Sequence, residues 1–171
     1  MRQLLLLRHA KSSWDDRRLA DRDRPLSQRG QRNAAMMRTA MRDLGLAPDL
    51  VLVSSSRRTM ETLEALEPWD DAPLIEQVDS LYLGGPAQLL AVLHEVAETV
   101  RSVLLIGHNP GLHELALALA GSAPPAAEAR LRAKFPTAAL AEFTVSGLWG
   151  DVGRQTTNLV RLVTPAELRE G

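Results

Sequence analysis

The chain has 171 residues, of which 45% are hydrophobic and 24% charged, and its formal net charge at pH 7 is -1. This balance excludes intrinsic disorder, a nucleic-acid coat and a polybasic membrane surface. The absence of cysteine excludes disulfides, thiolate metal sites and cysteine nucleophiles. We expect one domain over residues 1–171, soluble and cytoplasmic, because the length suffices for one core and no stretch resembles a signal peptide or a membrane span.

The first half of the chain predicts two strands, each followed by a helix. Four consecutive leucines at 4–7 are too few for a buried helix and too apolar for a half-exposed strand, so they predict a central parallel strand. A helix is predicted from its N-cap Ser27 to about Leu44, where Gly45 ends it. A second strand is predicted at 50–53, and the serines at 54–56 can cap the helix that follows.

The second half continues this alternation. The predicted elements are, in order, a weak strand at 74–78, a helix from 86 to about 100, a buried strand at 103–106, a helix ending at Gly121, a loop at 122–128, and two strands at 138–145 and 158–163. Alternating strands and helices predict a three-layer α/β/α sandwich with a mostly parallel central sheet. We expect the last strands to add an antiparallel edge strand.

Cationic and histidine side chains follow three of the predicted strands. Arg8 and His9 follow the first strand, Arg57 and Arg58 follow the second, and His108 follows the fourth. Because the carboxyl ends of parallel strands share one edge of the sheet, we expect these side chains to converge. Guanidinium groups suit phosphate, and a histidine near neutral pH is a nitrogen nucleophile. The pattern therefore predicts a site for a phosphoryl dianion and for its transfer.

The residues around the first strand resemble a known family. Arg8-His9-Ala10 is similar to the Arg-His-Gly signature of the histidine phosphatase superfamily, which has the phosphoglycerate mutase-like fold; alanine stands where glycine is usual. The wider pattern resembles the small phosphohistidine phosphatases of the SixA type. The matching segments cover nearly the whole chain in the expected order: residues 8–12, 24–26, 29–30, 53–62, 103–111 and 134–138.

The resemblance implies a role for each of the four central residues. His9 corresponds to the nucleophile that becomes phosphorylated, and Arg8 to the residue that binds the phosphoryl group beside it. The second arginine of the family lies four residues after the serine that ends the strand, which selects Arg58 over Arg57. His108 corresponds to the second histidine, which contacts the phosphoryl oxygens.

Other polar residues receive secondary assignments. Arg24 is expected to reach the pocket from its loop, and Asn109 to assist through its backbone N–H. Related mutases carry an asparagine near the position of Asp15; we place Asp15 outside the site because a carboxylate would repel the dianion. Asp79 is the candidate general acid, and Glu76 is a weaker one.

The reaction expected from the resemblance is hydrolysis through a phosphohistidine enzyme intermediate. Short connections predict an open pocket, which suits phosphohistidine on a protein because imidazole leaves with little proton assistance. The alternatives are a small-metabolite phosphomonoester phosphatase and a non-catalytic phosphate-binding module, which would need the arginines but not His9. We expect no metal and no cofactor, since arginines supply the positive charge. We also expect a monomer that binds neither nucleic acid nor membrane.

Overall fold

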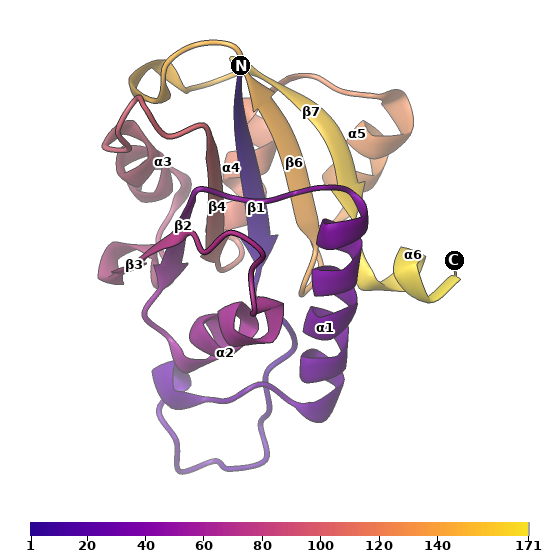
Figure 1. Ribbon diagram of the computed structural model, residues 1–171. Helices are drawn as coiled ribbons and strands as arrows, with labels where there is room; N and C mark the ends of the chain where they lie inside the picture. Colours follow the sequence, from indigo (N-terminus) through magenta and orange to yellow (C-terminus); the bar gives the residue numbers. More distant parts are fainter. Residues whose placement is uncertain (171) are drawn as a thin grey trace.

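A seven-stranded sheet forms the centre of the molecule, with helices on both faces (Figure 1). The computed structural model describes residues 1–170. The strand order is β3-β2-β4-β1-β6-β7-β5. The strands are β1 (Arg2–Arg8), β2 (Leu50–Ser54), β3 (Leu74–Val78), β4 (Ser102–Gly107), β5 (Ala120–Ser122), β6 (Leu140–Val145) and β7 (Thr157–Val163). The helices are α1 (Gln28–Asp43), α2 (Arg57–Leu66), α3 (Pro86–His94), α4 (Gly111–Leu119), α5 (Pro125–Ala133) and α6 (Pro165–Glu170).

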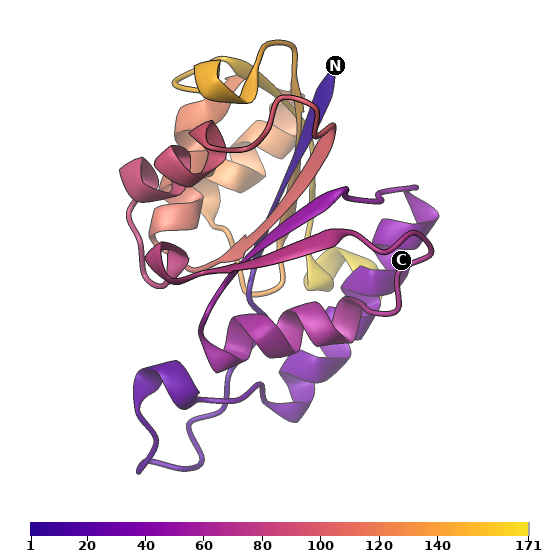
Figure 2. The same cartoon turned by 60° about the vertical axis from the view of Figure 1, so that its left-hand side comes forward.

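The four leucines of β1 divide the core into its two halves. All four are at most 1% exposed, as expected for a strand covered on both faces. Successive side chains of a strand point to opposite faces. Leu4 and Leu6 accordingly pack with α3, α4 and α5, whereas Leu5 and Leu7 pack with α1 and α2. The predicted three-layer α/β/α sandwich is confirmed, and Figure 2 shows the two helical layers on either side of the twisted sheet.

The antiparallel strand lies inside the sheet and not at its edge. β6 is antiparallel to both of its neighbours, β1 and β7, while the edge strands β3 and β5 each pair in parallel. The expected antiparallel edge is thus corrected to an internal strand. The reason lies at the end of β1, where the N–H of Ala138 donates to the carbonyls of Arg8 and His9 (3.1 and 3.0 Å). The chain therefore enters β6 at the carboxyl end of β1 and runs back along it.

Several element boundaries differ from the sequence-based expectation. Helix α3 ends at His94 and not near residue 100, and residues 122–128 are only partly a loop because α5 begins at Pro125. The first N–H groups of a helix have no hydrogen-bond partner within the helix, so proline, which has no N–H, is well suited to the first helical position. Pro125 therefore favours a helix start at this point. The strand β5 and the helix α6 lie outside the predicted elements, although Thr164-Pro165-Ala166-Glu167 has the capping-box pattern of a helix start. Within residues 1–170, no helix combines the length and apolar character that crossing a membrane requires.

Candidate functional site

The register of two central strands brings the histidines together. β1 and β4 are parallel neighbours in which Arg8 pairs with Gly107. His9 and His108 each come one residue later, so they leave the sheet side by side. The N–H of His9 donates to the Gly107 carbonyl at 3.1 Å, and the two imidazole ring centroids lie 5.2 Å apart. The structure thus places both predicted histidines at one point of the sheet edge.

The turn from β2 into α2 delivers Arg58 to the same point. Ser56 caps α2, its hydroxyl accepting from the N–H of Thr59, and Arg58 lies in the first helical turn. Arg58 is 4% exposed, whereas Arg57 points outward and pairs with Glu61 at 3.0 Å. Adjacent residues of a helix point in different directions, so Arg58 is buried whereas Arg57 lies at the surface.

These side chains line a cavity of about 270 Å³. The six residues expected to handle phosphate all contribute to its wall. The complete lining consists of Arg8, His9, Lys11, Ser12, Trp14, Arg24, Arg58, Leu83, His108, Asn109 and Thr137. Within the described part of the chain this lining holds three guanidinium groups and no carboxylate, which gives the cavity the character of an anion site.

His9 is fixed in one tautomer. Its Nδ1 lies 2.7 Å from the carbonyl oxygen of Ala10, which can only accept, so Nδ1 carries the proton. Nε2 is then unprotonated. Burial, with added repulsion from Arg58 and other arginines, lowers the pKa of His9 to about 4, although the Ala10 carbonyl acts in the opposite direction. His9 is therefore neutral at pH 7, with a free lone pair on Nε2.

His108 is held through its other ring nitrogen. Its Nε2 lies 2.8 Å from the Ser54 hydroxyl, and the side chain is almost fully buried. Burial and the neighbouring His9 and Arg58 lower the pKa of His108 to about 3. Its Nδ1 is buried without a hydrogen-bond partner among the described residues. An unpaired buried nitrogen of this kind is a group that a bound oxyanion can satisfy.

A carboxylate behind the cavity orients two of its arginines. Arg58 donates to the backbone carbonyl of Asp21 at 2.8 Å and to its Oδ2 at 3.0 Å, and Arg24 donates to Oδ1 at 3.1 Å. The hydroxyl of Tyr82 donates to the same carboxylate at 2.5 Å. The bonds from Tyr82 and then from Arg58 lower the pKa of Asp21 to about 2, so it is ionised at neutral pH. Arg24 in turn stacks over the ring of Trp14.

The carbonyl of Phe135 fixes the opposite wall. It accepts from the guanidinium of Arg8 at 3.3 Å and from the side-chain amide of Asn109 at 2.7 Å. Arg8 keeps a buried Nε without a partner among the described residues. Asn109 therefore lies where the sequence predicts it, while the role expected for its backbone N–H stays a prediction.

Asp79 is not brought into the cavity. Its side chain is 82% exposed and pairs with Arg22 at 3.1 Å. Hydrogen bonds from Ser55 and Arg22 lower the pKa of Asp79, so it is ionised at neutral pH and has no proton to donate. Glu76, the weaker candidate, is an exposed residue of β3. Asp79 is thus expected at the cavity but lies outside its lining, and its role as general acid stays a prediction.

Sequence reasoning missed Asp21 and Tyr82. Tyr82 meets the ring of His108 edge-on, with centroids 5.4 Å apart, besides binding Asp21. Asp21 stands among alternating acidic and basic residues that read as a solvated loop, and Tyr82 follows a short 3₁₀ turn at 79–81. The one available signal was that Tyr82 is the only tyrosine in the chain.

Comparisons with known proteins identify the family of this chain. The family model described as histidine phosphatase superfamily (branch 1) matches residues 4–79. An uncharacterized protein of Mycobacterium tuberculosis is 37% identical over 161 residues, which cover 93% of this chain and 99% of that protein. The matched family segment contains Arg8, His9, Arg24 and Arg58.

Solved structures extend the likeness over the whole fold. A protein from Nakamurella multipartitia that carries the name of the phosphohistidine phosphatase SixA is 29% identical, with a TM-score of 0.83 and 96% of each chain covered. One from Agrobacterium tumefaciens with the same name is 28% identical, with a TM-score of 0.82, covering 96% of this chain and 98% of the other. The fold is phosphoglycerate mutase-like. The chain belongs to the histidine phosphatase superfamily and is of the SixA type.

Proposed function

We propose that this phosphatase removes the phosphoryl group from phosphohistidine on a protein, through a covalent intermediate on His9. The observation that carries the proposal is the fixed tautomer of His9, whose unprotonated Nε2 lies in a cavity with three guanidinium groups. A nucleophile needs a free lone pair, and a transferring phosphoryl group needs positive charge around its equatorial oxygens. Both requirements are met without any rearrangement of the site.

In the first step, Nε2 of His9 forms a bond to phosphorus as the P–N bond of the substrate breaks. The electron pair of that bond stays on the substrate imidazole, which leaves as a neutral ring when its other nitrogen is protonated. The phosphorylated His9 ring is then a cation, because Nδ1 keeps its proton. The Ala10 carbonyl, 2.7 Å away, stabilises this cation by accepting the hydrogen bond.

In the second step, water attacks phosphorus and the P–Nε2 bond breaks. The electron pair returns to Nε2, and the product leaves as dihydrogen phosphate, so the free enzyme is restored in its original tautomer. Throughout, Arg8, Arg24 and Arg58 stabilise the phosphoryl oxygens. The unpaired Nδ1 of His108 supports a further contact with a phosphoryl oxygen.

The leaving group favours phosphohistidine over alkyl esters. An alkoxide leaves poorly and needs a proton donor, but within the described chain the cavity lining holds no carboxylate and the adjacent Asp21 is ionised. An imidazole whose other nitrogen already carries a proton leaves as a neutral ring and needs no such donor. A small phosphorylated metabolite remains the alternative substrate, and a clear preference for an alkyl phosphate would favour it.

The decisive experiment compares wild type with His9→Ala on a phosphohistidine peptide, an aryl phosphate and an alkyl phosphate. We expect wild type to hydrolyse the phosphohistidine peptide with much higher kcat/KM than the alkyl ester, and His9→Ala to be inactive while keeping its Tm. When the reaction is stopped in alkali, wild type should carry covalent phosphate that mild acid removes, as expected for an acid-labile P–N bond, and His9→Ala should carry none. Turnover by His9→Ala would overturn the proposal.

The proposal assigns charge stabilisation to the guanidinium groups alone. We therefore expect exhaustive dialysis against EDTA to leave kcat/KM unchanged. Recovery of activity only after a divalent metal is restored would contradict this part of the proposal.

A further inference from the structure

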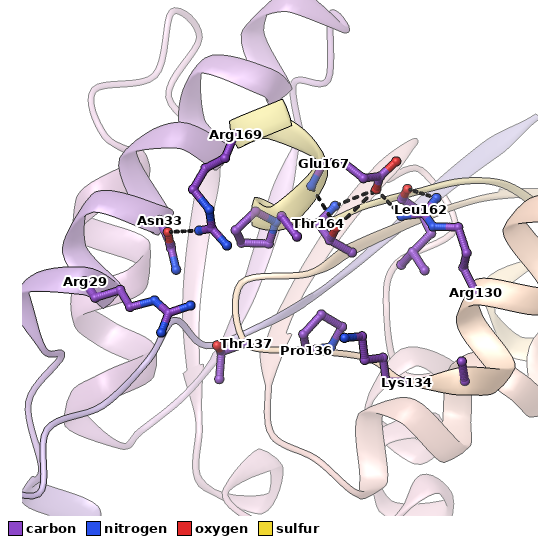
Figure 3. Close-up of a pocket in the computed structure, with 13 residues that line it drawn as sticks. Arg29, Asn33, Arg130, Lys134, Pro136, Thr137, Leu162, Thr164, Glu167 and Arg169 are labelled. Atoms are coloured by element: carbon purple, nitrogen blue, oxygen red, sulfur yellow. Dashed lines mark hydrogen bonds and ion pairs between the residues drawn. The ribbon is translucent and has the colours of Figure 1, made fainter. Parts of the chain in front are cut away.

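A second, larger cavity lies next to the catalytic one. It has a volume of about 390 Å³ and is bounded by α1, α6, the end of α5 and the segment that follows α5 (Figure 3). Four of its lining residues are cationic and one is acidic. The charged members are Arg29, Arg130, Lys134, Arg169 and Glu167. Nothing in the proposed phosphoryl transfer uses this cavity.

Thr137 joins the two cavities, because it lines both of them. The residue after it, Ala138, donates its N–H to the carbonyls of Arg8 and His9. On the other side, Ser27 at the start of α1 donates its N–H to the carbonyl of Lys11 at 2.9 Å. Both walls of the second cavity are therefore attached to the segment that carries the nucleophile.

Two of the cations differ from the others in their contacts. Arg169 donates to the buried Oδ1 of Asn33 at 3.1 Å, and Arg130 donates to Glu167 and to the Leu162 carbonyl. Glu167 also accepts from Thr164, so the one acidic group of the lining is already engaged.

Arg29 and Lys134 point into the same space from different walls. In Figure 3 no dashed line connects either of them to another residue drawn. Both residues are exposed. They therefore offer positive charge to a ligand. Among the residues drawn, no free carboxylate of the protein competes with a ligand carboxylate for these two cations.

A hollow beyond Trp14, which also lines the catalytic cavity, has balanced charge. Asp16 and Asp21 line it together with Arg17 and Arg24, and the nearby Asp79 pairs with Arg22. A protein docked over His9 would thus meet ion-paired groups at this hollow and the cations Arg29 and Lys134 at the second cavity. Such an asymmetry orients a partner and disfavours the reversed orientation.

We propose that this second cavity binds acidic side chains of the protein substrate, one to three residues from the phosphohistidine. The inference rests on the proposed function. An extended chain advances about 3.3 Å per residue, so neighbours of the phosphohistidine reach an adjoining cavity while the phosphoryl group stays at His9. The cavity therefore selects phosphohistidine segments flanked by Asp or Glu.

The test uses the full-length protein and two synthetic phosphohistidine peptides of equal length, one with glutamates flanking the phosphohistidine and one with glutamines. The measured quantity is the ratio of kcat/KM for the acidic peptide to that for the neutral one. We expect a ratio well above one for wild type. Exposed ion pairs are modest, so Arg29→Ala and Lys134→Ala should each lower the ratio by roughly two- to fivefold. Arg29→Glu should lower it further.

Arg132→Ala is the matched control, because it removes the same charge from α5 at a residue outside the cavity, where Arg132 pairs with Glu128. Its ratio should equal that of wild type. Equal hydrolysis of both peptides by wild type would overturn this inference and leave the proposed function standing. Hydrolysis of the aryl phosphate but of neither peptide would overturn the proposed function and this inference together.

Discussion

Replacement of Arg58 by alanine tests the electrostatic design of the catalytic cavity. The guanidinium is 4% exposed and is fixed by two bonds to Asp21, at 2.8 and 3.0 Å. Its removal has two consequences. The phosphoryl group loses a preorganised cation, and the Asp21 carboxylate loses one of the two guanidinium groups that neutralise it.

The expected effect is large. Loss of one preorganised donor to a developing oxyanion costs about 2.7–4 kcal/mol, a factor of about 10²–10³ in rate. Once Arg58 is removed, the Asp21 carboxylate is only partly neutralised, and it repels the phosphoryl dianion. Residues in direct contact couple by about 0.5–3 kcal/mol, so the double variant Arg58→Ala/Asp21→Asn should recover part of the activity.

The assay is kcat/KM on an aryl phosphate for wild type, both variants and Arg57→Ala, with Tm as a check on folding. Arg57 is the matched control: it is adjacent in sequence but exposed, and its pair with Glu61 is worth about 0.3–0.5 kcal/mol. We expect Arg57→Ala to stay within about threefold of wild type. A larger loss in Arg57→Ala than in Arg58→Ala would refute the reasoning, and a double variant less active than Arg58→Ala would refute the role given to Asp21.

Three further predictions concern pH, the general acid and the core. The pKa values of His9 and His108 are lowered from 6.5 to about 4 and about 3, so between pH 6.5 and 4 the unfolded chain binds more protons. The free energy of unfolding should therefore fall as pH falls through this window; urea titrations showing no such decline would contradict the pKa values. Asp79→Asn should leave kcat/KM for alkyl and aryl phosphates within about twofold, because its ion pair is exposed, and a selective loss on the alkyl ester would restore it as general acid. Leu6→Ala should destabilise the fold by about 2–5 kcal/mol in chemical denaturation, whereas Leu44→Ala, at a site 38% exposed, should change it by about 0.5 kcal/mol or less; equal effects would contradict the assigned core.

The central strands were predictable because their residues leave few alternatives. A run of four leucines between polar residues suits only a strand covered on both faces, and each such strand brings its last residues to one edge of the sheet. Arg8, His9, the pair Arg57 and Arg58, and His108 follow from that rule before any side chain is placed, and the family resemblance then selects Arg58 over Arg57. Their catalytic roles remain predictions, which the variants above test.

The remaining features depend on tertiary contacts that local sequence does not encode. Asp21 and Tyr82 lie on loops and short turns far apart in the sequence, and they meet through their own hydrogen bond and through the contacts that both make with Arg58. The start of α5 was misread because proline marks both loops and first helical turns. The position of Asp79 near a strand end says nothing about its exposed ion pair with Arg22, so local sequence could not predict that this side chain lies outside the cavity.

The backbone around the nucleophile is hydrogen-bonded to three other parts of the chain. The N–H of His9 donates to β4, its carbonyl accepts from Ala138, and the N–H of Ala10 donates to the Thr62 hydroxyl on α2 at 3.0 Å. Opening this segment would require separation of the central strands, which open only with the whole domain. We therefore expect the His9 amide to be among the slowest to exchange with deuterium, at a rate set by global unfolding. Catalysis would then take place on a rigid backbone segment, and substrate entry would depend only on the residues at the rim of the cavity.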